Sequence, residues 1–203
     1  MTESIIFDSN IKPLGLPCNV ILKDHYDQGE PNDETIDHIL SDTAGVMIER
    51  IVAIGGGSVI DIGKMMMIRG AYPFRDVVSG KTPIETDKTL IVIPTTCGTG
   101  SEVTNGGIVT IKETGLKTGI MSEKLTATFA VLIPELLDGL PHKVFMYCSV
   151  DALSHSIESF LSPTRGNEMA RAVGARSIEL ILGGYADMIR DGQGVRKSLH
   201  GNF

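Results

Sequence analysis

The sequence predicts an α/β fold, with a parallel sheet followed from Pro141 by a purely helical region. Two short apolar runs rich in β-branched residues, Ile51–Ile54 and Leu90–Ile93, are too short for helices and fit buried strands. Each run is followed at once by a loop rich in glycine or threonine, and the first loop opens a helical pattern. Strands and helices in alternation are the order expected of a parallel sheet.

The N-terminal part of the chain contains two further candidate strands. Ser4–Phe7 is a short apolar run ending in Asp8, and Asn19–Leu22 is a second one. In dinucleotide-binding folds, an acidic side chain at a strand end can accept hydrogen bonds from ribose hydroxyls. The alternative is a turn-forming aspartate before Ser9 and Asn10, and both interpretations of Asp8 stay open.

A helix is predicted to follow the polar turn Asp27–Asp33. Pro31 precedes a good helix start, Asn32 or Asp33 can cap it, and apolar residues from Ile36 to Leu40 form one face. This helix leads to the strand Ile51–Ile54.

The glycine turn after that strand is the first candidate site. Gly55, Gly56, Gly57 and Ser58 precede a run with apolar residues at helical spacing. Glycine lets the backbone approach a ligand closely, and the first amides of a helix are unpaired donors at the positive end of its dipole. A phosphate satisfies both conditions, which predicts a Rossmann-like nucleotide-binding turn. The turn lacks the G-x-G-x-x-G spacing, so an ordinary strand-to-helix turn is the alternative.

A second loop strengthens this prediction. Thr95, Thr96 and Thr99 lie in a glycine-containing loop after the strand Leu90–Ile93, where hydroxyl donors can contact a ligand. Ligands of open α/β sheets bind beyond the carboxyl ends of the strands. The two loops together therefore predict a nucleotide crevice, and Cys97 between the threonines is expected to be a small filler rather than a nucleophile.

The chain between and after these loops is less informative. Residues 72–88 are expected to form a polar connection, and Met65–Met67 to fill the core. Two alternating runs, Gly107–Ile111 and Lys117–Met121, predict a hairpin, and Phe129–Ile133 predicts a further strand.

Helical patterns follow Pro141, including a long helix over Asn167–Met188. Asp151 and His155 are four residues apart, which places them on one helical face. A carboxylate and an imidazole so spaced can chelate a divalent metal, although a hydrogen bond between them is the commoner explanation.

Composition limits the class of protein. The 203 residues are 42% hydrophobic and 21% charged, as expected for a soluble globular chain, and the net charge of −7 argues against nucleic-acid binding. No run approaches the ~20 apolar residues that span a membrane, and the first residues do not form a signal peptide. Three cysteines without metal-site spacing predict a reducing, cytoplasmic location.

Several segments resemble the iron-containing (group III) alcohol dehydrogenase family. The pairing of AIGGGSVIDIGK (residues 53–64) with IPTTCGTGSEVTN (93–105) is highly specific. Within that family, three more segments resemble 4-hydroxybutyrate dehydrogenases: GEPNDETI (29–36), GIMSEKLTATFAVLIPELLDGLP (119–141) and SVDALSHSIESFLSP (149–163).

The resemblance implies an NAD- and metal-dependent oxidoreductase acting on a CH–OH group. It implies an acid near Asp8 that favours NAD over NADP, a supporting role for Asp61, and a cofactor-facing lysine at Lys117, whose alternative is a solvated hairpin charge. It also implies that Asp151 and His155 are the first two ligands of Fe²⁺, with Zn²⁺ as the alternative. The expected substrate is a small alcohol or aldehyde, such as 4-hydroxybutyrate and succinate semialdehyde, and a homo-oligomer is left open.

The resemblance also predicts the domain organisation. Residues 1–140 are expected to form a dinucleotide-binding domain with an incomplete N-terminus, and residues 141–203 the first helices of a truncated α-helical metal-binding domain. The family's two later metal-binding histidines have no match in the sequence. The alternatives are therefore another alcohol or polyol dehydrogenase of this family, or a nucleotide-binding chain without turnover.

Overall fold

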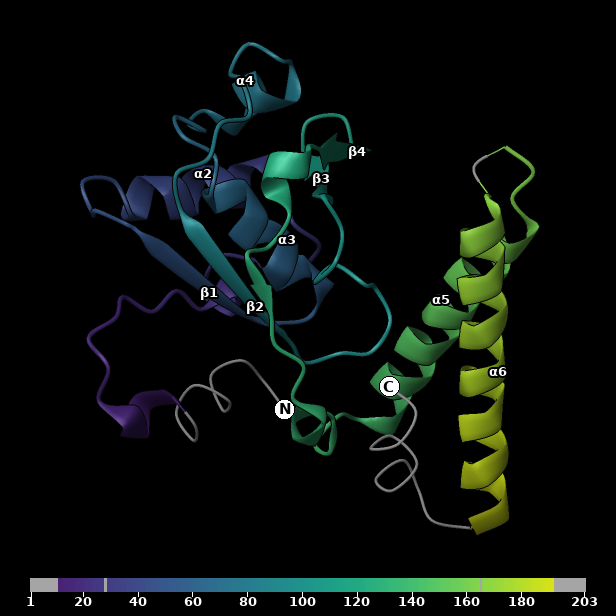
Figure 1. The fold of residues 1–203 in the computed structure, drawn as a ribbon. Coiled ribbons are helices and arrows are strands. Elements are labelled where there is room, and N and C mark those ends of the chain that lie inside the picture. Colours follow the sequence, from purple (N-terminus) through teal and green to yellow (C-terminus); the bar gives the residue numbers. More distant parts are fainter. Residues whose placement is uncertain (1–10, 28, 165, 192–203) are drawn as a thin grey trace. The chain divides into compact units, whose positions relative to one another are not determined.

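A computed structural model describes residues 11–27, 29–164 and 166–191 of the chain. These residues belong to two compact units (Figure 1). The first unit contains the chain up to Pro94 together with Ser101–Leu132, and the second contains Thr95–Gly100 and the chain from Ile133 onward. The first is an α/β unit and the second is helical. The expected domain division at residue 140 stays a prediction.

The α/β unit contains the predicted parallel sheet. Its strands β1 (Arg50–Gly55), β2 (Thr89–Pro94) and β5 (Phe129–Ala130) lie side by side in that order. β1 and β2 run parallel, with Gly55 opposite Pro94, so both strands end at the same edge. The predicted strands around Ile51–Ile54 and Leu90–Ile93 are confirmed, whereas the strand expected over Phe129–Ile133 is shorter.

Helices α2 (Asp33–Asp42) and α3 (Gly57–Met66) build the core of this unit. The predicted cap of α2 is confirmed, because the Asn32 side chain accepts a hydrogen bond from the Thr35 amide at 2.9 Å. α3 packs closely on the sheet at Gly63, where an added Cβ would lie 2.9 Å from the Ala53 Cβ. Met65–Met67 are buried in the apolar core, as predicted.

Two expectations for the α/β unit are wrong. Asn19–Leu22 forms no strand; Ile21 packs on the core, but the segment has no strand partner among the described residues. An apolar run indicates burial and does not by itself fix the backbone conformation. The connection over residues 72–88 includes a short helix, α4 (Phe74–Val78), whose Phe74 side chain is fully buried. The expected strand Ser4–Phe7 and Asp8 lie outside the described residues.

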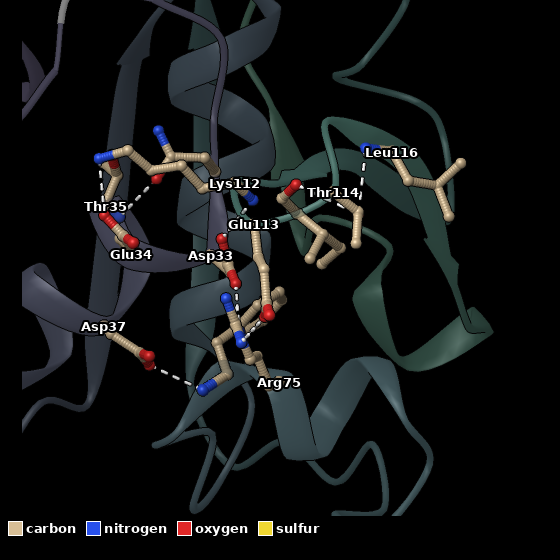
Figure 2. A network of polar contacts seen from close by, with 12 residues as sticks. Asp33, Glu34, Thr35, Asp37, Arg75, Lys112, Glu113, Thr114 and Leu116 are labelled. Atoms are coloured by element: carbon tan, nitrogen blue, oxygen red, sulfur yellow. Dashed lines mark hydrogen bonds and ion pairs between the residues drawn. The ribbon is translucent and has the colours of Figure 1, made fainter.

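The predicted hairpin is confirmed as β3 (Gly106–Ile111) and β4 (Leu116–Met121), which pair antiparallel. A polar network joins its turn to α2 and α4 (Figure 2). Asp33 is buried in this network, where it accepts hydrogen bonds from the Lys112 amide at 2.9 Å and from Arg75 Nε at 2.7 Å. Arg75 also contacts Glu113 on the hairpin turn, and Asp37 accepts a hydrogen bond from the Phe74 amide.

The helical unit contains α5 (His142–Leu161) and α6 (Glu168–Asp191), which confirms the helices expected after Pro141. Small residues let the two helices approach: a Cβ on Gly174 would lie 2.9 Å from the Ser156 carbonyl oxygen. Hydroxyl pairs join the helices at Ser156 with Ser177 and at Ser149 with Tyr185. Throughout the described ranges, no helix has the length and apolar character required to cross a membrane.

Candidate cofactor and metal sites

The glycine turn has the predicted strand–turn–helix geometry. β1 ends at Gly55, Gly56 is the N-cap with φ −74° and ψ −177°, and α3 begins at Gly57. A Cβ on Gly55 would lie 2.6 Å from Val59 Cγ2, so a larger residue would displace the helix. No side chain caps this end of α3, and its first amides can therefore donate to an oxygen of a ligand. Phosphate binding by Gly55, Gly56, Gly57 and Ser58 stays a prediction.

Asp61 lies on α3 and contacts the hairpin rather than the glycine turn. Its carboxylate accepts a hydrogen bond from the Ile108 amide at 3.0 Å, and an added Cβ on Gly107 would lie 2.8 Å from its carboxyl carbon. Burial raises the pKa of Asp61, opposed by the Ile108 amide, the charge of Lys64 and a hydrogen bond with Ser101. The contacts of Asp61 thus support β3, and the supporting role expected for it at the glycine turn stays a prediction.

The threonine loop, Thr95–Gly100, belongs to the helical unit. A Cβ on Gly98 would lie 2.5 Å from the Cys148 carbonyl oxygen and 2.9 Å from its Cα, so the loop packs directly on the α5 backbone. A side-chain hydrogen bond joins Thr96 to Cys148. The glycine turn and the threonine loop therefore lie in different units, and the crevice that they would form together stays a prediction.

Cys97, in the middle of this loop, is a partly buried thiol. It packs with Leu137 and Phe145, and burial raises its pKa from 9.0 to about 11, with a smaller contribution from Cys148. A nucleophilic cysteine needs the opposite shift. Cys97 therefore has the burial and protonation expected of a filler residue.

Lys117 lies on β4 and forms an ion pair with Glu30 at 2.7 Å. Both side chains are more than half exposed, at 59% and 60%. These contacts suit a surface charge of the hairpin, and the cofactor-facing role of Lys117 stays a prediction.

Asp151 and His155 lie on α5 with the predicted spacing. The His155 Nε2 to Asp151 Oδ1 distance is 3.8 Å, which is too long for a hydrogen bond, and both side chains are about half exposed. The carboxylate oxygen of Asp151 and the ring nitrogen of His155 are therefore available as metal ligands. A pair of one oxygen and one nitrogen ligand suits Fe²⁺ or Zn²⁺. Within the described residues, no group of three or more His, Cys, Asp or Glu side chains could hold a metal ion. The two side chains fit part of a metal site.

A hollow lies beside His155 at the end of α5. It is lined by His155, Glu158, Ser159, Ser162 and Gly166. Glu158 is one helical turn beyond His155, so the imidazole has a second carboxylate nearby on its own helix. Space next to a candidate metal ligand is what a small substrate would need.

Sequence reasoning assigned no separate role to Lys64, although this residue is the most completely buried charged group of α3. Its contacts are with residues 40 and 42 positions away, which no local pattern reveals. The sequence feature that could have indicated a buried lysine is the position of Lys64 among apolar residues, three positions after Asp61.

A parallel sheet with an uncapped helix N-terminus at the carboxyl end of a strand places the chain among the open α/β proteins, which bind ligands at this edge of the sheet. The sequence model for iron-containing alcohol dehydrogenases matches residues 4–134, and the chain belongs to this family.

Curated relatives are consistent with this family. The chain is 39% identical over 203 residues to the 4-hydroxybutyrate dehydrogenase of Clostridium kluyveri, covering 100% of this chain and 54% of that protein. It is 39% identical over 149 residues to the 4-hydroxybutyrate dehydrogenase of Cupriavidus necator, and this match covers 70% of this chain and 38% of that protein. The chain thus spans about half or less of the length of these relatives.

Solved structures share the fold. The sulfoacetaldehyde reductase of Bifidobacterium kashiwanohense, in complex with NAD⁺, matches with a TM-score of 0.77 and 24% identity, covering 98% of this chain and 54% of that one. An iron-containing alcohol dehydrogenase matches with a TM-score of 0.73, and this match covers 85% of this chain and 46% of that one.

Proposed function

We propose that the chain carries the cofactor-binding region and the first metal ligands of an NAD-dependent alcohol dehydrogenase that interconverts 4-hydroxybutyrate and succinate semialdehyde. The observation that carries this proposal is the uncapped N-terminus of α3 directly after the glycine turn. The substrate assignment is supported by 39% identity to a 4-hydroxybutyrate dehydrogenase along the whole chain.

In this proposal the amides of Gly56, Gly57 and Ser58 donate to the pyrophosphate of the cofactor. Thr95, Thr96 and Thr99 position the nicotinamide half for hydride transfer, while Asp8 accepts from the ribose hydroxyls and selects NAD over NADP. Lys117 adds a positive charge at the hairpin. Each of these groups binds or orients the cofactor, and none of them changes its covalent structure.

Asp151 and His155 hold the metal in this proposal. A divalent ion such as Fe²⁺, or Zn²⁺ as the alternative, acts as a Lewis acid on the alcohol or aldehyde oxygen when it is bound. Both side chains are about half exposed and are not hydrogen-bonded to each other, so neither must break a mutual contact to bind. An open surface hollow lies beside His155 on the same helix.

A second candidate is a different dehydrogenase or reductase of the same family. The chain is also 33% identical to the sulfoacetaldehyde reductase of Bilophila wadsworthia, covering 66% of the chain and 35% of that protein. A panel of short alcohols and aldehydes, with and without an anionic group, distinguishes these activities. A third candidate is a nucleotide-binding chain without turnover, which saturable NADH binding without NADH oxidation would indicate.

The proposal is tested by fluorescence titration of the 203-residue chain with NADH, comparing Gly56→Val with the unchanged chain. The φ and ψ angles of Gly56 are accessible to valine, so the fold is expected to persist while the new side chain blocks access to the α3 amides. We expect saturable binding by the unchanged chain and about a tenfold loss for the variant, since one or two amide contacts are lost.

Gly183→Val is the matched control, because Gly183 is exposed on α6 and an added Cβ there meets no atom within 4 Å outside the backbone of its own helix. It should bind NADH like the unchanged chain. A folded chain without saturable NADH binding would overturn the proposal. Equal binding by Gly56→Val would show that the glycine turn is not the pyrophosphate site.

A further inference from the structure

Lys64 is a fully buried lysine whose bonding capacity is completely used. Its Nζ donates to the Thr104 carbonyl at 2.9 Å, to Thr104 Oγ1 at 2.8 Å and to the Gly106 carbonyl at 2.7 Å. An ammonium group has three N–H donors, and here three oxygens accept them. A reacting amine must be accessible to its substrate and must have a free N–H group or lone pair. Lys64 has neither, because it is buried and its three N–H groups are used.

Asp61 lies one helical turn before Lys64 and contacts the same segment. Its carboxylate bonds the Ile108 amide and the Ser101 side chain. We call Asp61 and Lys64 the α3 polar pair. The pair contacts residues 101, 104, 106 and 108, so side chains of α3 hold the path from Ser101 into β3 along its whole length.

This path is the exit of the threonine loop. Ser101 directly follows Gly100, while Pro94 before the loop is fixed in β2 opposite Gly55. The helix that carries the α3 polar pair also begins at the glycine turn. One helix thus begins at the proposed phosphate-binding turn and bonds the residues that directly follow the loop expected to position the nicotinamide.

The energetic cost of this arrangement argues against a space-filling role. Burial lowers the pKa of Lys64, opposed by the charges of Asp61 and Glu102, so its charged form has lost much of its hydration. The neighbouring Met65 and Ile60 are buried and apolar, and a methionine would occupy a similar volume without that cost. Buried ionic groups that persist despite this cost are best attested as devices that fix a particular geometry.

We propose that Lys64, supported by Asp61, is a positioning residue that preorganises the threonine loop for cofactor binding. The proposal rests on the proposed function, because the loop's role in holding the cofactor belongs to that function. Lys64 touches no cofactor itself; it acts through Thr104 and Gly106. Its removal should therefore loosen the loop and weaken cofactor binding while the sheet and its core remain.

The test combines hydrogen exchange with NADH titration on Lys64→Met and Thr104→Val. We expect Lys64→Met to speed amide exchange in residues 95–108 and to weaken NADH binding, each by about tenfold, because three oxygens of this path lose their charged donor. Thr104→Val removes one of the three acceptors of the ammonium, together with a hydroxyl that can donate to the Ser101 or Gly106 carbonyl at 3.3 or 3.2 Å, and should have a smaller effect in the same direction. The double variant should exchange at least as fast as Lys64→Met but slower than the two single effects combined, because the variants share the contact between the ammonium and Thr104 Oγ1.

Lys88→Met is the matched control. Lys88 is also a mostly buried lysine of the α/β unit, but its Nζ donates to the Met67 carbonyl, away from the loop exit. Its exchange pattern over residues 95–108 should match that of the unchanged chain. If Lys64→Met does not fold, Thr104→Val still reports on the same contact, since it keeps the ammonium and both carbonyls.

The outcomes separate the two proposals. Unchanged exchange over residues 95–108 in folded Lys64→Met and Thr104→Val overturns the positioning role, whatever the NADH result. Faster exchange with unchanged NADH affinity also overturns it, because the loop is then not preorganised for the cofactor. If the unchanged, folded chain does not bind NADH, the proposed function fails, and exchange still decides whether Lys64 fixes the segment.

Discussion

The two units of this chain are stabilised in different ways. The α/β unit has a continuous apolar core in which Ile60, Met65 and Phe74 are fully buried, and its buried charges are bonded to backbone groups of other elements. The helical unit buries few large apolar side chains, among them Leu137, Phe145 and Ile181. Many apolar side chains of α5 and α6 are exposed instead, namely Val144, Tyr147, Val150, Ile157, Phe160, Leu161, Met169, Val173, Leu182 and Ile189.

The difference shows which candidate site is fixed by its own surroundings. The glycine turn starts a helix that packs on the sheet through Gly63 and on β3 through the α3 polar pair, so its position follows from the core. Asp151 and His155 lie on a helix that packs on α6 through Phe145 with Tyr185 and through hydroxyl pairs, but both side chains are about half exposed. The proposed metal ligands are therefore exposed side chains, whereas the glycine turn starts a helix whose residues 60–66 are buried.

The largest expected effect is on the free energy of unfolding, when one isoleucine of each unit is replaced by alanine. Ile60→Ala should lower the free energy of unfolding by about 4 kcal/mol, since the side chain is fully buried and a cavity would remain. Ile157→Ala on α5, where the side chain is 41% exposed, should cost about 0.5 kcal/mol. Urea denaturation followed by circular dichroism measures both. Equal losses would contradict the contrast between the units.

The next effect concerns the buried carboxylate of the polar network. Asp33→Asn should cost about 3 kcal/mol, because Arg75 and the Lys112 amide lose a charged acceptor at a site where Asp33 is almost fully buried. Glu113→Gln is the control and should cost less than about 0.5 kcal/mol, since that side chain is 68% exposed. Both are measured by urea denaturation at neutral pH.

The same carboxylate predicts a pH dependence. Burial alone would raise the pKa of Asp33, but the Lys112 amide and Arg75 outweigh it, and the pKa is lowered from 3.8. A lowered folded-state pKa gives stability that is present above pH 3.8 and is lost as the pH falls through the folded value. Asp33→Asn should lack this part of the acid dependence, and an unchanged acid transition in the variant would contradict the prediction.

The smallest change is in thiol reactivity and leaves stability at neutral pH unaffected. Cys18 is exposed, whereas burial raises the pKa of Cys97 from 9.0 to about 11. Two pKa units reduce the thiolate fraction about a hundredfold, so iodoacetamide at pH 8 should alkylate Cys18 well before Cys97. Peptide mass spectrometry over time measures both rates. Comparable rates would mean that the threonine loop opens readily, and that the helical unit is looser than its packing implies.

Local signals in the sequence were sufficient for much of the fold. The Asn32 cap, the strands before each loop, the glycine turn and the hairpin were predicted because each depends on residues close together in the chain. The strand predicted over Asn19–Leu22 is wrong, since strand formation depends on a distant partner that this segment lacks among the described residues. The helix at Phe74–Val78 was missed because its few apolar residues lie in a polar context.

The candidate sites were predictable to the same extent. The spacing of Asp151 and His155 on one helical face follows from four residues of helix and is confirmed. The contacts of Lys64 with Thr104 and Gly106 join residues 40 and 42 positions apart, and no periodicity predicts them. Identification of the Ile108 amide as a donor to Asp61 likewise required the three-dimensional structure.

Because the threonine loop belongs to the helical unit, it limits where the chain can be truncated or recombined. Thr95–Gly100 folds with the helical unit, while the residues on both sides of it fold with the other unit. A gene segment that begins at Ile133 would encode α5 without Gly98, which packs on the backbone of Cys148. Recombination between two relatives at a single crossover near Ile133 would therefore combine a loop from one parent with the helix under it from the other. The six residues and α5 are expected to change together over evolution, although the chain separates them by more than thirty positions.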